Sequence, residues 1–415
     1  MNLDSSNQAK LRFLEGIKFF NEEKYELAEK NFLESLELAP QRLSVISNLI
    51  KIYIVTKQIQ KLDEILTKYK NLNKDKEILF GEAYNFFFKE NFDRSIKICN
   101  QIIKNKDIRY PIQDLLASNF KKKGNFLDAL KIYKKKLIEN ENDYKIYYNI
   151  GCLLFELGKI HQANYHFIKS KNLNPKFADI SWRQSLCALT LKDFKNGFLL
   201  YEDRWKRENH PNKKFDNIKF PNDISQIKNK KILIWDKQGL GDTINFSRFV
   251  IDILKFTKKV TFVVDKKLKD ILSDLDIEIN VIDYENLNEI NFDFQIALGS
   301  LPKLLDISTT YDIKFYKLSL PEKKIPKKKY IDNDKFNIGL AWSGNPNYPM
   351  DKYRSISFDR FEKLLQLKKF NFYKLSKTTK KSVPINQKTF SNIFDFGNKS
   401  FFEIAVVIRE LDLVI

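Results

Sequence analysis

Hydrophobic residues follow a helical spacing in the first half of the chain and a mixed spacing in the second. Up to about residue 210, apolar side chains recur every three or four positions, which predicts amphipathic helices. From residue 231, short apolar runs alternate with helical stretches, and this alternation predicts a parallel sheet covered by helices. The 415 residues have room for more than one domain, and the change of period places the main boundary between residues 210 and 230.

The helical half repeats with a period of 34 residues. In units counted from Ala9 and from Tyr144, the same four positions hold two small residues, an aromatic residue and a proline: Gly16, Ala28, Phe32 and Pro40, and then Gly151, Ala163, Phe167 and Pro175. Two antiparallel helices approach most closely where the small residues meet, the aromatic side chain fills the gap to the next unit, and proline ends the second helix. The pattern resembles the tetratricopeptide repeat (TPR).

Units that begin at Lys76, Tyr110 and Ala178 match this pattern less closely. Residues 43–75 keep only a helical period, so we treat this stretch as a degenerate unit. About six units thus fill residues 9–210 and predict an all-α, right-handed solenoid whose stability is a sum of neighbour contacts. Such a solenoid offers a concave surface to a protein partner, or it acts as a spacer that positions the next domain. The sequence leaves both interpretations open.

The second half predicts two successive α/β layers. Strands are expected at 231–235, 260–265, 278–282 and 292–298, with helices near 243–256 and 267–275. After a basic stretch the pattern restarts, with strands at 336–342, 370–375 and 411–415 and helices at 358–367 and 401–409. Two Rossmann-like lobes, at 230–320 and 334–415, describe the GT-B architecture, in which ligands bind in the cleft between the lobes.

Four segments of this half, taken in order, carry a resemblance to a known family: residues 231–250 (KILIWDKQGLGDTINFSRFV), 292–305, 338–365 and 401–415. Together with the repeats, the chain resembles bacterial TPR proteins fused to a glycosyltransferase domain related to heptosyltransferases (glycosyltransferase family 9). The resemblance implies transfer of a sugar from a nucleotide-sugar donor to a protein or glycan acceptor, without a metal or other cofactor. It also implies a protein partner for the TPR region.

The loop after the first predicted strand holds the candidate catalytic residue. In the related heptosyltransferases the aspartate of the Leu-Gly-Asp loop is a candidate general base, and Asp242 matches that position. A carboxylate at a helix N-terminus can take the proton from an attacking hydroxyl, or it can simply cap the helix. Four neighbours are expected to complete a loop that binds substrate or phosphate: Gln238, Gly239, Gly241 and Thr243. The two glycines either let the backbone approach the ligand or only form the turn. The threonine is expected to be the N-cap or a first-turn residue of the helix.

The donor side is expected after the strand at 336–342. Ser343, Gly344 and Asn345 follow this strand, and Lys352 and Arg354 come shortly after them. A pair of cations past a strand end suits a departing diphosphate, although the same residues also fit an ordinary charged surface. The Asp-Asn-Asp segment at 332–334 is interpreted as a turn and not as a metal site.

The chain departs from the family at its last strand, 411–415, where the family continues into a histidine-bearing loop that helps to hold the donor. We therefore expect this chain to be a fragment with impaired activity, and whether it is an enzyme stays open. The alternative is a non-catalytic TPR scaffold with a degenerate α/β part.

Amino-acid composition disfavours several classes of function and location. The net charge is +20 (73 basic and 53 acidic residues), yet the lysines are spread along the chain, and their densest cluster, at 323–329, surrounds a proline as a linker would. Nucleic-acid binding is therefore disfavoured. Three scattered cysteines and three histidines provide little material for zinc or thiol chemistry. No apolar run approaches the length of a membrane span, and the first residues lack a secretory signal, so a cytoplasmic protein is expected.

Overall fold

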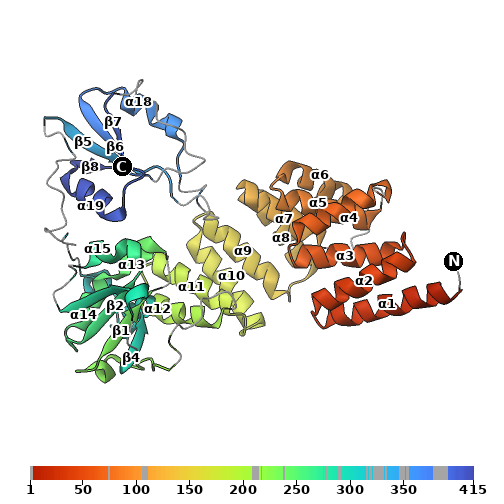
Figure 1. Ribbon diagram of the computed structural model, residues 1–415, viewed down its shortest axis with the longest axis horizontal. Helices are drawn as coiled ribbons and strands as arrows, with labels where there is room; N and C mark the ends of the chain where they lie inside the picture. Colours follow the sequence, from red (N-terminus) through yellow and green to blue (C-terminus); the bar gives the residue numbers. More distant parts are fainter. Residues whose placement is uncertain are drawn as a thin grey trace. The chain divides into compact units, whose positions relative to one another are not determined.

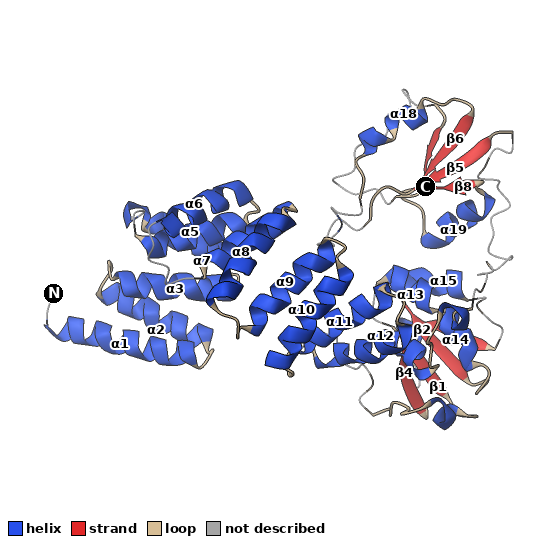
Figure 2. Cartoon of the chain, turned by 180° about the vertical axis from the view of Figure 1, so that it is seen from behind, coloured by secondary structure: helices blue, strands red, loops and turns tan. Residues whose placement is uncertain are grey.

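The computed structural model divides the chain into two compact units, residues 1–187 and 188–415, which are described separately (Figure 1). It describes residues 3–72, 75–104, 111–207, 215, 217–236, 239–273, 275, 278–287, 291–314, 316, 320, 331, 334–344, 351, 355–376 and 391–415. In these residues the first unit contains helices only, and the strands all lie in the second unit (Figure 2).

The first unit is a stack of antiparallel helix pairs: α1 (Leu3–Asn21) with α2 (Tyr25–Leu38), α3 (Leu43–Val55) with α4 (Ile59–Lys68), α5 (Lys76–Phe88) with α6 (Phe92–Lys104), α7 (Ile112–Lys123) with α8 (Phe126–Glu139), and α9 (Tyr144–Glu156) with α10 (Ile160–Leu173). A short 3-10 helix, η1 (Lys70–Leu72), follows α4. Residues 43–75, treated as degenerate from the sequence, thus form a regular pair. They do so because the apolar face of α3, with Ile46, Leu49 and Ile50, is buried against its neighbours.

The two best sequence repeats have the same packing. A Cβ added at Gly16 would lie 2.6 Å from the ring of Phe32, and one added at Gly151 would lie 2.6 Å from the ring of Phe167. Both rings are fully buried. A hydroxyl also bonds across each pair, from Ser35 to the Ala9 carbonyl and from Ser170 to the Tyr144 carbonyl, at 2.7 and 2.8 Å. The repeated steric fit and the repeated hydrogen bond show a TPR-like helical solenoid.

The sixth predicted repeat is shared between the two units. Its first helix, α11 (Ala178–Thr190), crosses the division at residue 187. Its second helix, α12 (Phe194–Tyr201), belongs to the second unit, where Phe198 is buried in the core beneath the first sheet. The 3-10 helix η2 (Glu202–Lys206) continues directly from α12.

The first sheet has four parallel strands in the order β3-β2-β1-β4: β1 (Ile232–Trp235), β2 (Val260–Val264), β3 (Ile279–Asp283) and β4 (Phe294–Ala297). Helices α15 (Lys266–Leu272) and α16 (Leu301–Leu304) follow β2 and β4. The helix predicted at 243–256 is two helices, α13 (Leu240–Phe246) and α14 (Arg248–Ile253). They meet at Ser247, whose hydroxyl donates to the Ile244 carbonyl and favours the break.

The second sheet has the same strand order, β7-β6-β5-β8, again entirely parallel: β5 (Phe336–Leu340), β6 (Phe370–Lys374), β7 (Ile393–Asp395) and β8 (Leu413–Val414). Helix α19 (Phe401–Glu410) precedes β8, as predicted. The helix predicted at 358–367 is shorter, a 3-10 turn η8 (Phe358–Arg360) followed by α18 (Glu362–Leu365), and β7 was not predicted. In each sheet the first strand lies between the second and the fourth, the arrangement that creates a topological switch point.

Candidate functional site

The loop after β1 is held in place by a buried aspartate. Asp236 follows β1 directly and is 7% exposed. Its carboxylate accepts a hydrogen bond of 2.5 Å from the hydroxyl of Thr243 in α13, and its backbone carbonyl accepts one from the hydroxyl of Tyr284. Burial raises the pKa of the Tyr284 phenol, so this group stays a donor at neutral pH. The start of α13 is therefore tied to the end of β1.

Asp242 lies in the first turn of α13 with an exposed side chain. Within the described residues its carboxylate makes no hydrogen bond or ion pair, and the N-cap residue of α13 is Gly239, which provides no side-chain cap. The helix-cap interpretation of Asp242 thus has no hydrogen bond to support it there. An exposed, ionisable group at the switch-point end of β1 remains available to a ligand.

The neighbours predicted for this loop divide into three cases. Thr243 is a first-turn residue and not the N-cap. It is 4% exposed, and its hydroxyl holds the loop in place by donating a hydrogen bond to the Asp236 carboxylate. Gly241 is exposed, and a Cβ there would meet nothing within 4 Å, whereas a Cβ at Gly239 would lie 3.3 Å from the Asp242 carboxylate. Gln238 lies outside the described residues.

The predicted donor segment is described only in part. Ser343 and Gly344 are exposed just past β5, at the switch point of the second sheet. Their backbone N–H groups donate to the hydroxyls of Ser376 (3.2 Å) and Ser355 (3.3 Å), which fixes the loop and leaves the two residues accessible. The other three residues assigned to the donor, Asn345, Lys352 and Arg354, lie outside the described residues, as do Asp332 and Asn333.

A buried arginine marks a further candidate region, which the sequence did not predict. Arg204 in η2 is 2% exposed. One guanidinium nitrogen, Nη1, donates to the Glu202 carboxylate at 2.5 Å and to the Tyr201 carbonyl at 3.0 Å, and Nη2 donates to the Ser300 hydroxyl at 2.6 Å. The same guanidinium lies 4.5 Å from the ring centroid of Tyr201 and 4.6 Å from that of Trp205. Such a cation is strongly held, because burial makes each of these contacts stronger.

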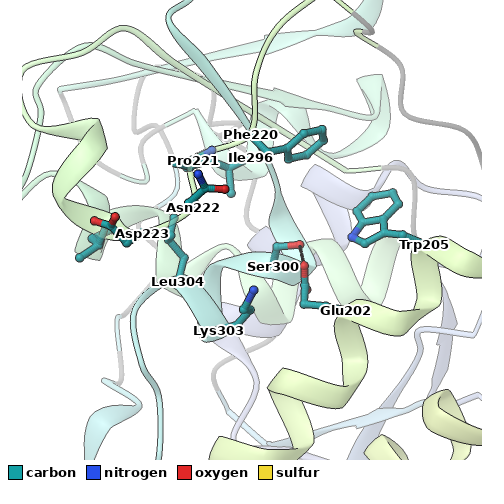
Figure 3. Close-up of a pocket in the computed structure, with 11 residues that line it drawn as sticks. Glu202, Trp205, Phe220, Pro221, Asn222, Asp223, Ile296, Ser300, Lys303 and Leu304 are labelled. Carbon is teal, nitrogen blue, oxygen red and sulfur yellow. Dashed lines mark hydrogen bonds between the residues drawn. The ribbon is translucent and has the colours of Figure 1, made fainter.

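A pocket of about 460 Å³ opens beside this arginine (Figure 3). It is bounded by η2, by the segment at 220–224, by β4 and by α16. Its lining residues are Glu202, Trp205, Phe220, Pro221, Asn222, Asp223, Ile224, Ile296, Ser300, Lys303 and Leu304. The segment at 201–205, Tyr-Glu-Asp-Arg-Trp, combines charged and aromatic residues that are visible in the sequence. The sequence does not indicate that Arg204 contacts Ser300, which is 96 positions away.

Two kinds of feature are absent from the described residues. No group of three or more histidine, cysteine, aspartate or glutamate side chains there could hold a metal ion. No helix in those residues is long and apolar enough to cross a membrane.

Comparison with known proteins finds similarity to solved structures only. No protein-family profile matches the chain, and no curated protein is detectably similar in sequence. The solved structures include PilF of Pseudomonas aeruginosa (13% identity, 48% of this chain and 90% of that chain, TM-score 0.40), the type IV pilus biogenesis factor PilW (16%, 47% and 90%, 0.42) and a thermophilic TPR protein of Thermus thermophilus (13%, 44% and 99%, 0.38). At such identities and TM-scores they add nothing to the helix-pair geometry described above.

Proposed function

We propose that the chain combines a protein-binding repeat unit with an α/β unit that binds a nucleotide sugar and transfers its sugar. The repeat unit is the better supported part, because its helix pairs build a continuous stack. Helix α3 contacts α5, and α5 contacts α7, so these odd-numbered helices lie side by side. We assign the odd-numbered row to the extended concave surface that repeat proteins use for binding.

Polar and aromatic side chains follow one another along the odd-numbered helices. Tyr84 of α5 lies near Asp114 of α7, and Tyr148 of α9 interacts with Arg183 of α11. The Arg183 guanidinium also lies 5.0 Å from the ring centroid of Trp182. Tyrosine, tryptophan and arginine are the residues that most often dominate binding energy in protein interfaces. The first unit, residues 1–187, has 32 basic and 23 acidic residues, a net charge of +9, which favours acidic segments as partners.

Peptide display on the purified chain tests the repeat unit. We expect the selected peptides to be rich in acidic residues and to lose at least tenfold in affinity with Tyr148→Ala or Arg183→Gln. Tyr165→Ala is a control on the other row of helices, because Tyr165 lies on α10 and is 55% exposed. Tyr148 itself also packs against the rings of Phe167 and Phe177. Tyr148→Phe keeps the packing and separates loss of binding from loss of folding. Peptides that respond equally to Tyr148→Ala and Tyr165→Ala would place the binding surface elsewhere.

The sugar-transfer part rests on one observation. Both sheets have the strand order 3-2-1-4, and in each case the residues assigned to substrate follow the first strand at the switch point: Asp242 after β1, and Ser343 and Gly344 after β5. Open α/β sheets bind ligands at this position.

In the proposed reaction the acceptor hydroxyl attacks the anomeric carbon of the donor sugar. The bond from that carbon to the nucleoside diphosphate breaks, and the diphosphate departs with the electron pair. The hydroxyl proton passes to the Asp242 carboxylate, which Asp236 and Thr243 position through the fixed start of α13. Polar groups after β5 would face the donor. No metal or other cofactor takes part.

Release of nucleoside diphosphate from a panel of uridine, guanosine and adenosine diphosphosugars tests this chemistry. General-base catalysis contributes about 10²- to 10⁴-fold, so we expect Asp242→Asn to lower the rate by that factor without changing donor affinity. Asp306→Asn is a matched control, because Asp306 is an exposed loop residue whose positive φ of 51° suits asparagine. A wild-type chain that neither binds nor turns over any of these donors would favour the second candidate, a non-catalytic scaffold in which only the solenoid is functional.

A further inference from the structure

The pocket beside Arg204 is separate from the residues to which we assign transfer. Segment 219–220 pairs with β4 through Lys219 and Phe294, on the strand edge that faces away from β1. The pocket lies on this outer edge, whereas Asp242 follows β1. We propose that it binds a neutral carbohydrate of one or two sugar rings.

The pocket has the size and the mixed lining of a small-molecule site. Its volume of about 460 Å³ lies within the range of about 300–1,000 Å³ found for such sites. Ile296 is buried at its floor, with Leu304 and Ile224 beside it. Figure 3 shows Lys303 extending from α16 toward the space between Asn222 and Ser300. Polar groups on an apolar floor can orient a ligand that has both kinds of surface.

Charge selects a neutral ligand. The Glu202 carboxylate is already compensated by Arg204 at 2.5 Å and accepts a further bond from Ser300 at 3.1 Å. That leaves Asp223, whose carboxylate accepts the backbone N–H of Ser225 at 2.8 Å, and Lys303, which makes no ion pair within the described residues. One carboxylate and one ammonium leave the lining with no excess of either charge, so a purely anionic or purely cationic ligand gains no advantage there. An uncharged ligand can use both, because hydroxyl groups donate to carboxylates and accept from ammonium groups.

The aromatic side chains select a ring. Trp205 and Phe220 are half-buried, and their ring centroids are 6.2 Å apart at an interplanar angle of 58°. The other contacts of Trp205, with the Arg204 guanidinium and with Trp235, hold the indole in place, so little freedom is lost when a ligand packs against it. A pyranose has a C–H face that packs on such rings and a rim of hydroxyls that hydrogen-bond. Carbohydrate is the class that matches both features.

The decisive experiment uses fluorine NMR of the whole chain labelled with 5-fluorotryptophan. The chain has four tryptophans, so single Trp→Phe variants assign each signal. The probes are the methyl glycosides of glucose, galactose, mannose and N-acetylglucosamine, with benzoate and phenethylamine as charged ring controls. We expect at least one glycoside to shift the Trp205 signal saturably and to leave the Trp182 signal unchanged.

Variants of exposed lining residues then locate the site without threatening the fold. Each hydrogen bond lost should weaken glycoside binding by about two- to tenfold, so we expect this from Lys303→Ala and from Asn222→Ala. Lys206→Ala is the matched control, because Lys206 is exposed on η2 and does not line the pocket. The proposal is overturned if no glycoside moves the Trp205 signal, if both lining variants bind as tightly as wild type, or if only a charged control binds. None of these results bears on the transfer proposal, which is tested with nucleotide sugars and Asp242.

Discussion

Replacement of Arg204 by methionine tests how far the second unit depends on its buried cation. Arg204→Met keeps most of the volume but removes the bonds to Glu202, Ser300 and the Tyr201 carbonyl. Removal of one partner from a buried ion pair costs about 3–5 kcal/mol. Because the Glu202 side chain is 23% exposed, water reaches the carboxylate that is left behind and reduces this cost. We therefore expect a loss of about 2–4 kcal/mol in the free energy of unfolding.

Urea unfolding followed by tryptophan fluorescence measures this loss. A Trp182→Phe background leaves Trp205, Trp235 and Trp342, all in residues 188–415, so that the signal reports on the second unit. Glu202→Gln should also destabilise, and the double variant should cost at least about 1 kcal/mol less than the sum of the single changes, because the two groups contact each other. Lys206→Met should stay within about 0.5 kcal/mol of wild type. A cost below about 1 kcal/mol for Arg204→Met, or strict additivity with Glu202→Gln, would refute the reasoning.

Three further predictions follow from packing and ionisation. Gly151→Ala should destabilise the repeat unit by about 1–3 kcal/mol through the clash with Phe167, and Phe167→Leu in the same chain should recover part of this; a stabilised Gly151→Ala in thermal unfolding would contradict the repeat packing. The hydrogen bond from Lys269 lowers the pKa of Asp283 to about 2, below its unfolded value of about 3.9, so Asp283 contributes stability above pH 4 that is lost as the pH falls toward 2. The stability difference between wild type and Asp283→Asn should therefore shrink between pH 6 and pH 3, and a constant difference would exclude this account. Burial raises the pKa of the Cys99 thiol to about 12 and that of Cys187 to about 11, so neither should react with Ellman's reagent at pH 8 until urea is added; rapid labelling of the native chain would show that these thiols are accessible.

The sequence predicted the elements whose signal is local. The 34-residue pattern predicted helix pairs that approach closely at Gly16 and Gly151, because small residues at fixed spacing are visible in the sequence. It assigned the aromatic side chain to the gap with the next unit, whereas Phe32 and Phe167 each pack against the glycine of their own unit. The hydrogen bond from Ser35 to the Ala9 carbonyl was not predicted, since a serine in a helix has many possible partners. Short apolar runs likewise predicted β1 to β6 and β8, whereas the sequence of β7, Ile-Phe-Asp, contains no apolar run of comparable length.

The candidate sites were predictable to different extents. Asp242 was identified through the family resemblance, by its match to the Leu-Gly-Asp loop, and the structure places it in the first turn of α13 with an exposed side chain. Thr243 is buried beside Asp236, whose carboxylate accepts the hydrogen bond from its hydroxyl. In the sequence Asp236 has no feature that distinguishes it from an ordinary loop residue. The Arg204 network joins η2 to Ser300 across 96 positions, and no pattern in one sequence reports such a contact.

The central claim is that the second unit binds a nucleotide sugar beyond β5. Trp342 lies just before Ser343 and packs on Phe358 and Phe361, with ring centroids 5.2 and 5.8 Å away, so its fluorine signal reports on this position. Titration of the 5-fluorotryptophan chain with uridine, guanosine and adenosine diphosphosugars is the most direct test. The account predicts that at least one of them shifts the Trp342 signal saturably while the Trp182 signal stays unchanged. A Trp342 signal that no nucleotide sugar moves at millimolar concentration would contradict it.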